Sequence, residues 1–265
     1  MATNYKLNLQ PDRKIVSQSL LWNPPLSLGV DSTPPSYEIK SLGDLPIYDQ
    51  GALGSCTANA ILFSYHYVAK FKNNKYKHPS SRFYQYRESL LFIGNGNDDT
   101  GAYIEDAITV PNTRGVLPEY LWPYINSTVN FKILPKGQTM ESLRKLVSAS
   151  KGIEYNSIEK GPNLISSLEN MLYSGFPIVF GFWVYPSFFS TINRNRKAIV
   201  TVPKKGENIL GGHAVCLVGY NRMNKSFKVR NSWGPRWGDS GYFYMSYDFF
   251  STNNVFSFWV IKSVN

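Results

Sequence analysis

The hydrophobic pattern of this 265-residue chain changes character near its middle. From Ser55 onward, apolar residues recur at helical spacing, which predicts a helix with Cys56 in its first turn. Two more helices are expected in this half: one capped by Ser80 or Ser81 and running through Leu91, and one over residues 103 to 110, ending before Pro111. The first half therefore reads as helical.

The second half is rich in β-branched and aromatic residues. Pro162 suits the first turn of a helix that runs through Leu172, with Gly175 as its terminator. The strands expected after it cover residues 178 to 184, 198 to 202, 214 to 220, 227 to 230, 242 to 247 and 255 to 261. A helical half followed by a strand-rich half predicts an α+β architecture of two lobes with a cleft between them.

Composition limits the classes of protein that need to be considered. Hydrophobic residues make up 43% of the chain, which is enough for a large core, and no run approaches the roughly 20 apolar residues of a membrane span. The first residues do not resemble a signal peptide, so localisation stays open between an intracellular site and a lysosome-like vesicle. We expect a monomer with no membrane partner.

The net charge of +10 raises the question of a polyanionic partner. The densest basic cluster, Lys70, Lys72, Lys75 and Lys77, falls in a polar stretch that reads as a helix end running into a loop. A solvated loop is favoured over a polyanion-binding patch. Nucleic acid is therefore not expected to be a required partner.

The first 45 residues carry five prolines and little periodicity. They are expected to form an extended arm that packs on the body of the protein or covers part of it. The remaining residues, 46 to 265, are expected to form one domain. A segment that restrains a cleft and a purely structural wrap are both compatible with the arm's sequence.

The two cysteines, Cys56 and Cys216, are too few for a disulfide framework. Cys216 lies in an apolar run and is interpreted as a small buried hydrophobe. Cys56 instead follows the turn Gln50-Gly-Ala-Leu-Gly-Ser and enters a helix, whose N-terminal dipole and free N–H groups stabilise a thiolate. Cys56 is therefore the candidate nucleophile.

A thiol nucleophile needs a base, and the chain has three histidines. His66 lies ten residues along the same predicted helix as Cys56, about 15 Å away, and cannot reach the sulfur. His78 lies in the lysine-rich loop. His213 opens an apolar strand after two glycines, and Asn231, which opens a turn rich in glycine and tryptophan, could orient its imidazole through a hydrogen bond.

Three segments together resemble the signatures of the papain family, in the family's order. They are Gln50-Gly-Ala-Leu-Gly-Ser-Cys56, Gly212-His213-Ala214-Val215 with Val218-Gly219-Tyr220, and Asn231-Ser-Trp-Gly with Trp237-Gly-Asp-Ser-Gly-Tyr242. Thr100-Gly101 and Trp122-Pro-Tyr124 are further similar landmarks, so the resemblance spans roughly residues 45 to 247. It implies a papain-like, cathepsin-like cysteine peptidase that acts on protein or peptide substrates, with no cofactor and no metal.

The resemblance also implies roles for single residues. Cys56 would form a thioester acyl-enzyme, His213 would be its base, Asn231 would orient that base, and Gln50 would help hold the oxyanion. The substrate-binding residues implied are Thr100, Gly101, Gly212, Ala214, Trp233 and Trp237. Among these, Gly101 would pair with substrate backbone, Trp233 would shield the Asn231–His213 hydrogen bond, and Trp237 would form the leaving-group side of the cleft.

The chain departs from the family's pattern at three points. Leu53 replaces a cysteine that normally staples the helical lobe, and Thr57 replaces an aromatic residue beside the nucleophile. His213 lies 157 residues after Cys56, somewhat beyond the usual spacing, which predicts an enlarged inter-lobe segment around residues 125 to 160. None of these changes touches the atoms that make or break bonds.

The sequence also leads to expectations about which substrates the chain prefers and which reaction it catalyses. By the resemblance, residues beside His213 line the pocket for the substrate residue second from the cut, and Phe256 and Ser257 on the last strand are the nearest candidates for its floor. None of these residues is charged, so that substrate residue should be apolar. Endopeptidase action is the default, since the chain carries no His-His occluding loop. The alternatives are another thiol-dependent acyl transferase or glutaminase-like enzyme, and a catalytically inactive binding homologue.

Overall fold

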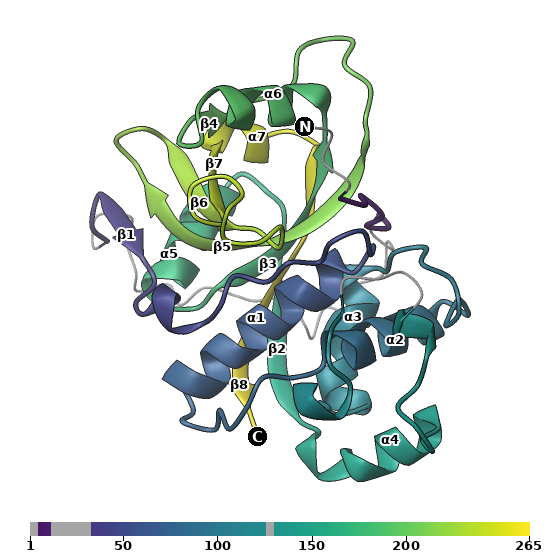
Figure 1. Ribbon diagram of the computed structural model, residues 1–265. Helices are drawn as coiled ribbons and strands as arrows, with labels where there is room; N and C mark the ends of the chain where they lie inside the picture. The colour runs from purple at the N-terminus through teal and green to yellow at the C-terminus, as the bar shows by residue number, and fades with distance from the viewer. Residues whose placement is uncertain (1–4, 12–32, 126–129) are drawn as a thin grey trace.

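The computed structural model describes residues 5–11, 33–125 and 130–265. Figure 1 shows two halves: a β-sheet with short helices above, and a group of helices below. The helix α1 (Cys56–Phe71) runs along the junction between the two halves. The α+β expectation of a helical lobe and a β-rich lobe is confirmed.

The helical half follows the predicted pattern closely. It contains α1, α2 (Arg82–Phe92), α3 (Ile104–Thr113) and α4 (Met140–Leu146), with short 3₁₀ turns at Leu42–Asp44, Glu119–Leu121, Asn130–Lys132 and Ser148–Ser150. The hydroxyl of Ser81, and not that of Ser80, caps α2 by accepting from the N–H of Tyr84. A side chain that accepts one of the free N–H groups stabilises a helix start.

One helix boundary differs from the prediction. α3 continues through Pro111 instead of ending before it. Proline lacks the N–H that would bond to the carbonyl of Ala107, four residues earlier. The side-chain amide of Gln85 donates to that carbonyl at 2.7 Å, so the acceptor left free by the proline is satisfied from α2.

The strands form one eight-stranded mixed sheet. In chain order they are β1 (Ser36–Glu38), β2 (Ile153–Ile158), β3 (Ile178–Val184), β4 (Ile199–Val200), β5 (Gly211–Asn221), β6 (Ser226–Arg230), β7 (Tyr242–Ser246) and β8 (Val255–Val264). The spatial order is β2-β8-β3-β5-β6-β7-β4, with β1 added to β5, and among the described strands only the β4–β7 pair is parallel. The long strand β5 lies at the centre and carries His213 opposite Phe182 of β3.

Three further helices accompany the sheet: α5 (Leu164–Tyr173), α6 (Pro186–Arg194) and α7 (Tyr247–Phe250). Pro162 lies in the turn before α5 and not in its first turn, because Asn163 is the N-cap. Gly175 ends this helix as predicted, with φ +82. The sequence reasoning did not find β1, β2, α4, α6 or α7; α4 and β2 lie in the enlarged inter-lobe segment.

The described residues form two hydrophobic clusters, and the larger one holds the halves together. The larger one joins the sheet to α1, and the smaller one joins α2 to the loops around Trp122 and Phe131. Leu53, at the position of the family's cysteine, is fully buried in the smaller cluster. α1 contributes to both clusters, so its N-terminus is fixed by packing from each lobe.

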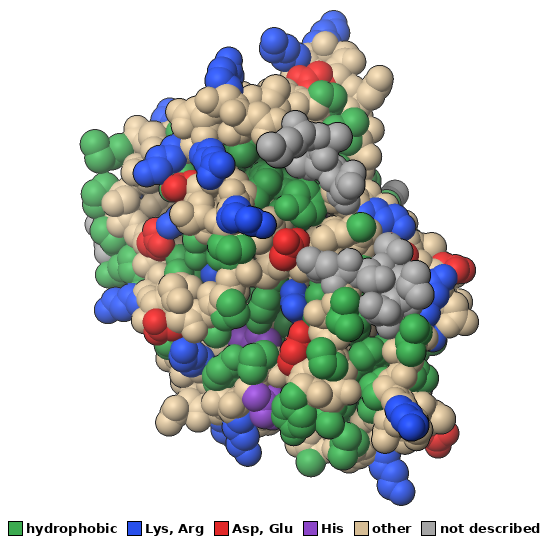
Figure 2. Space-filling view, viewed as in Figure 1, with side chains coloured by type: hydrophobic (Ala, Val, Ile, Leu, Met, Phe, Trp, Pro, Cys, Tyr) green, Lys and Arg blue, Asp and Glu red, His purple; other side chains and the backbone are tan. Residues whose placement is uncertain are grey.

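Charge is dispersed over the face of the molecule that Figure 2 shows. On the face in Figure 2, Lys and Arg side chains are spread apart among neutral and acidic ones. Two lysines of the basic stretch lie over aromatic rings, Lys70 over Phe71 and Lys72 over Phe176. Among the described residues, no helix is both long and apolar enough to cross a bilayer.

Candidate active site

Cys56 lies fully buried at the first position of α1. Burial raises the pKa of its thiol to about 11, because a thiolate loses its hydration there. Hydrogen bonds from the backbone N–H groups of Ala214, Thr57 and Cys56 itself act in the opposite direction. The bond from Ala214 brings the thiol next to the residue that follows His213 on β5.

His213 is oriented by Asn231. Its Nε2 lies 2.7 Å from the Asn231 Oδ1, and that same Oδ1 accepts from the backbone N–H of Ser232 at 2.8 Å. An atom that accepts from a backbone N–H is an oxygen, so His213 Nε2 must donate. Within the described residues, His213 Nδ1 has no hydrogen-bond partner. The neutral imidazole therefore presents an unprotonated Nδ1, the form required of a base.

Burial also sets the protonation of this histidine. It lowers the pKa of His213 to about 4, while the hydrogen bond to Asn231 acts to raise it. Because the thiol of Cys56 is held above its ordinary pKa and the imidazole below its own, both groups are neutral near pH 7 in this structure.

Gln50 is held at both ends of its side-chain amide. Its Oε1 accepts from the Ser232 hydroxyl at 2.7 Å, which fixes the amide's orientation. Its Nε2 donates to the Leu53 carbonyl at 2.9 Å and to the Lys6 carbonyl at 3.3 Å. The Gln50 amide group thus donates both to the turn that precedes α1 and to the N-terminal arm.

Aromatic side chains enclose the imidazole. The ring of Trp233 stacks on His213 with centroids 4.6 Å apart, and Trp237 meets Trp233 edge-on at 4.9 Å. Trp233 is buried and Phe189 also stacks on it. Trp233 therefore lies against the imidazole ring, and its role in shielding the His213–Asn231 hydrogen bond stays a prediction.

The described part of the N-terminal arm, residues 5–11 (Figure 1, dark purple), contacts several residues of the site. Tyr5 stacks on Trp233 at 4.7 Å, and its hydroxyl donates to the Trp233 carbonyl. The Lys6 carbonyl meets Gln50, as above, and the Leu9 N–H donates to the Gly212 carbonyl at 3.0 Å. The segment thus passes Trp233, Gln50 and Gly212 in turn.

Leu9 fills an apolar pocket beside His213. The pocket is bounded by Gly181 of β3, Gly212 of β5 and Phe256 of β8. A Cβ added at Gly181 would lie 2.5 Å from the Phe256 ring and 2.7 Å from the Leu9 side chain, so glycine at this position leaves the room that Leu9 occupies. Leu9 is only 4% exposed.

Thr100 and Gly101 form the opposite wall. The Gln10 side-chain amide donates to the Thr100 carbonyl at 2.8 Å. Gly101 has φ +78, and any Cβ there would collide with the Asn8 backbone carbonyl. The arm's own backbone bond goes to the next residue, from Gln10 N–H to the Ala102 carbonyl at 3.3 Å.

Several residues of the site were not found by the sequence reasoning. Ser232, which orients Gln50, stood inside the Asn-Ser-Trp-Gly motif. Asp99, which precedes Thr100, accepts from the Tyr86 hydroxyl at 2.6 Å and the Gly54 N–H at 2.9 Å. Glu105 of α3 accepts from the Ser257 hydroxyl near the last strand, so an acidic residue from another element lies close to a position where none was expected.

The structure brings the predicted site residues together from both lobes. Cys56 and Gln50 come from α1 and the turn before it, and His213 and Asn231 come from β5 and the loop after β6. In the described chain, no group of three or more His, Cys, Asp and Glu side chains could hold a metal ion. Thiol chemistry assisted by an imidazole, an amide donor and backbone N–H groups is what this arrangement can perform.

Residues 45–257 match the family described as papain family cysteine protease. The chain is 38% identical, over 222 residues, to an uncharacterized peptidase C1-like protein of Acanthamoeba polyphaga mimivirus, which covers 82% of this chain and 69% of the viral protein. It is 27% identical over 201 residues to cathepsin K of Gallus gallus, which covers 74% of this chain and 54% of that protein.

Solved structures agree with these similarities. Xylellain, a cysteine protease from Xylella fastidiosa, superposes with a TM-score of 0.80 at 30% identity, covering 98% of both chains. The bromelain protease of Ananas comosus shares the fold, with a TM-score of 0.63 at 21% identity, covering 87% of this chain and all of that one. The chain belongs to the papain family of cysteine proteases and is a cysteine-type peptidase.

Proposed function

We propose that the chain hydrolyses peptide bonds through a thioester on Cys56. His213 Nδ1 takes the thiol proton, and the sulfur attacks the substrate carbonyl carbon. The Gln50 amide and the Cys56 N–H stabilise the oxyanion that forms. As the C–N bond breaks, His213 gives the proton to the leaving amine. Water, deprotonated by His213, then releases the acid and restores the thiol.

The observation that carries the proposal is the tautomer of His213. Its Nε2–H donates to Asn231, which leaves a lone pair on Nδ1, and the backbone N–H of the adjacent residue, Ala214, donates to the Cys56 sulfur. A buried imidazole with only one nitrogen bonded is unusual, since buried polar atoms are normally paired. In the proposed reaction, this nitrogen is the one that receives the thiol proton.

The arm is proposed to restrain this site. Lys6 lies at the side-chain amide of Gln50, and Leu9 lies in the pocket beside His213. Residue numbers in the arm therefore increase from Gln50 toward that pocket. By the family resemblance, that pocket takes the substrate residue second from the cut, and substrate numbering falls in that direction. The arm therefore runs opposite to a substrate, which protects it from cleavage while it covers the buried, neutral Cys56 and His213.

We further propose endopeptidase action with an apolar preference at the substrate residue second from the cut. The support is Leu9, an apolar side chain already buried between Gly181, Gly212 and Phe256. An arginine side chain in that pocket would lose its hydration against these apolar neighbours. Peptides with Leu at this position should be cut faster than those with Arg.

A thiol-reactive peptidyl inhibitor with Leu at that position tests the proposal. Cys56→Ala should abolish both labelling and peptide hydrolysis, and His213→Ala should abolish hydrolysis. Cys216→Ala is the matched control: its sulfur is buried and bonded to the Ala60 carbonyl, and it should label and hydrolyse like the wild type. Substantial turnover by Cys56→Ala, or faster cleavage with Arg than Leu in the pocket, would contradict the assignment.

A further inference from the structure

Tyr124 belongs to a sequence landmark, Trp122-Pro-Tyr124, that the proposed reaction does not use. Its ring packs against the smaller hydrophobic cluster, and its hydroxyl makes two bonds to the turn before α1. The hydroxyl donates to the Gln50 carbonyl at 2.9 Å and lies 2.6 Å from the Ser55 hydroxyl. Gln50 and Ser55 stand at the two ends of the turn that leads into Cys56. One hydroxyl therefore spans the turn.

The direction of these bonds follows from the number of hydrogens. A carbonyl oxygen only accepts, so the single hydrogen of the Tyr124 hydroxyl is used on Gln50. The Ser55 hydroxyl must then donate to Tyr124, and its oxygen accepts from the Asn59 side-chain amide at 3.1 Å. The Asn59 Oδ1 accepts in turn from the Arg82 guanidinium at 3.2 Å. These hydrogen bonds form an unbroken series that runs in one direction, from a cation to the Gln50 carbonyl.

The series is enclosed by the protein. Gln50, Ser55 and Asn59 are each at most 1% exposed, and the Arg82 guanidinium lies over the Tyr124 ring at 3.9 Å. A buried polar group that loses its partner stays unpaired at a cost, so the series holds its members in one geometry.

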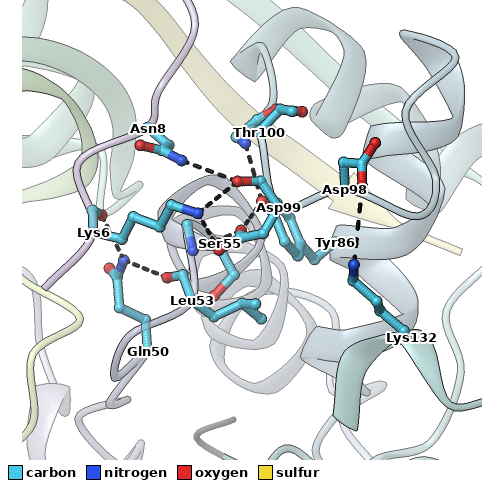
Figure 3. Close-up of polar contacts among 12 residues, drawn as sticks. Lys6, Asn8, Gln50, Leu53, Ser55, Tyr86, Asp98, Asp99, Thr100 and Lys132 are labelled. Carbon is cyan, nitrogen blue, oxygen red and sulfur yellow. Dashed lines mark hydrogen bonds and ion pairs between the residues drawn. The ribbon is translucent and has the colours of Figure 1, made fainter. Parts of the chain in front are cut away.

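Gln50 is held from both lobes. On the side of the β-rich lobe, the Ser232 carbonyl accepts from the Gln50 backbone N–H at 2.8 Å, and the Ser232 hydroxyl donates to the Gln50 side chain at 2.7 Å. On the side of the helical lobe, Tyr124 donates to the Gln50 carbonyl. Within the turn itself, the Gln50 amide donates to the Leu53 carbonyl (Figure 3). The Tyr124 bond is thus the contact that fixes the Gln50 backbone relative to the helical lobe.

We propose that Tyr124 is a positioning residue for the oxyanion. The inference rests on the proposed peptidase function, in which the Gln50 amide and the Cys56 N–H stabilise that charge. The Cys56 N–H belongs to the peptide group that joins it to Ser55, so the Tyr124 hydroxyl holds a bond next to each donor. Fixing both ends of the turn sets the distance between the two donors, which must both reach one oxygen atom in the transition state. Tyr124 acts through the turn and not on the substrate.

The test uses Tyr124→Phe, which removes the hydroxyl and keeps the ring that packs against Arg82. Two rates are measured on the full-length chain. One is kcat/KM for a peptide amide, whose cleavage passes through an oxyanion. The other is the rate at which iodoacetamide alkylates Cys56, in which the sulfur displaces iodide from a saturated carbon and no oxyanion forms.

The two rates should respond differently to the loss of the Tyr124 hydroxyl. The fraction of molecules with the arm undocked multiplies both rates equally, so the ratio of hydrolysis to alkylation is independent of it. We expect kcat/KM to fall about 10-fold, less than for loss of the Gln50 donor itself, because the donors remain but are held less well. The alkylation rate should stay at that of the wild type. A merely structural role would lower both rates together.

Tyr84→Phe is the matched control. The Tyr84 hydroxyl also donates to a backbone carbonyl in the helical lobe, that of Arg114 at 2.8 Å, which lies at the end of α3 and not in the turn before α1. Its ratio of hydrolysis to alkylation should equal that of the wild type. Ser55→Ala removes the other bond of the Tyr124 hydroxyl, keeps the Cys56 N–H, and should lower the same ratio.

Each outcome decides a different point. A wild-type ratio in Tyr124→Phe, a fall of both rates by the same factor, or an equal fall of the ratio in Tyr84→Phe overturns the inference while the peptidase function stands. If Tyr124→Phe does not fold, Ser55→Ala decides, and a wild-type ratio there overturns the inference in the same way. If iodoacetamide alkylates Cys56 in the wild type and yet no peptide is cut, the proposed function falls, and the inference falls with it.

Discussion

Replacing Leu9 by alanine is expected to release the cleft. Leu9 is 4% exposed in its pocket, and alanine would remove three carbon atoms from that contact. At about 0.8 kcal/mol for each buried methylene, docking of the arm should weaken by about 2 kcal/mol. If molecules with the arm undocked are the minor population, a loss of about 2 kcal/mol raises that population about 30-fold. The same factor should appear in every reaction that requires an open site.

The assay is the rate at which a small alkylating reagent modifies Cys56 in the full-length chain. Leu210→Ala is the control, because it removes the same atoms from a leucine that is 50% exposed beside β5, and its rate should not change. A point substitution is preferable to a truncation near Lys40, which would also delete β1. Equal modification rates in Leu9→Ala and the wild type would refute the idea that this contact restrains the site.

Two other predictions concern the site and the fold. Gln50→Ala should lower kcat/KM by about 10² to 10³, as for other oxyanion donors, and full activity in that variant would remove Gln50 from the role. His66, whose Nε2 accepts from the Ser80 N–H, has a pKa lowered by burial to about 3. In the unfolded chain the pKa of His66 returns to about 6.5, so the unfolded state takes up a proton more readily than the folded state as the pH falls. The free energy of unfolding should therefore decrease by about 2 kcal/mol between pH 7 and pH 5. Urea titrations at the two pH values measure the free energy of unfolding. The loss between pH 7 and pH 5 should be smaller in His66→Gln than in the wild type, whereas the control His78→Gln, changed in an exposed loop, should lose as much as the wild type. Equal losses in His66→Gln and the wild type would refute the lowered pKa of His66.

Much of the architecture could be predicted because its signals are local. The periodicity from Ser55 gave α1 with Cys56 at its start, and the apolar run at residues 178 to 184 coincides with β3. The lobes and the peptidase class followed from motifs that lie around these elements. The roles of Gln50 and Asn231 stay predictions, although the structure gives each a hydrogen bond suited to its role.

What the sequence did not reveal depends on contacts between distant segments. α3 runs through Pro111, and the carbonyl that the proline leaves free is satisfied by Gln85 on another helix. β1 is three residues long and acquires its strand conformation from pairing with β5, so its own sequence carries little signal. The ion pair between Asp99 and Lys6 joins residues 93 positions apart, so nothing in the sequence distinguished Asp99 from the other acidic residues.

The arm is attached to β5 at two places, with Leu9 bonded at Gly212 and Glu38 paired with Gly219. Seven strand residues separate these points, about 23 Å. The covalent connection therefore holds the restraining segment at an effective concentration of the order of millimolar. Dilution cannot lower this value, so the proposed restraint persists in a single molecule. One cut anywhere between residues 11 and 33 would turn the segment into a separate peptide, and its hold on the cleft would then fall as the solution is diluted.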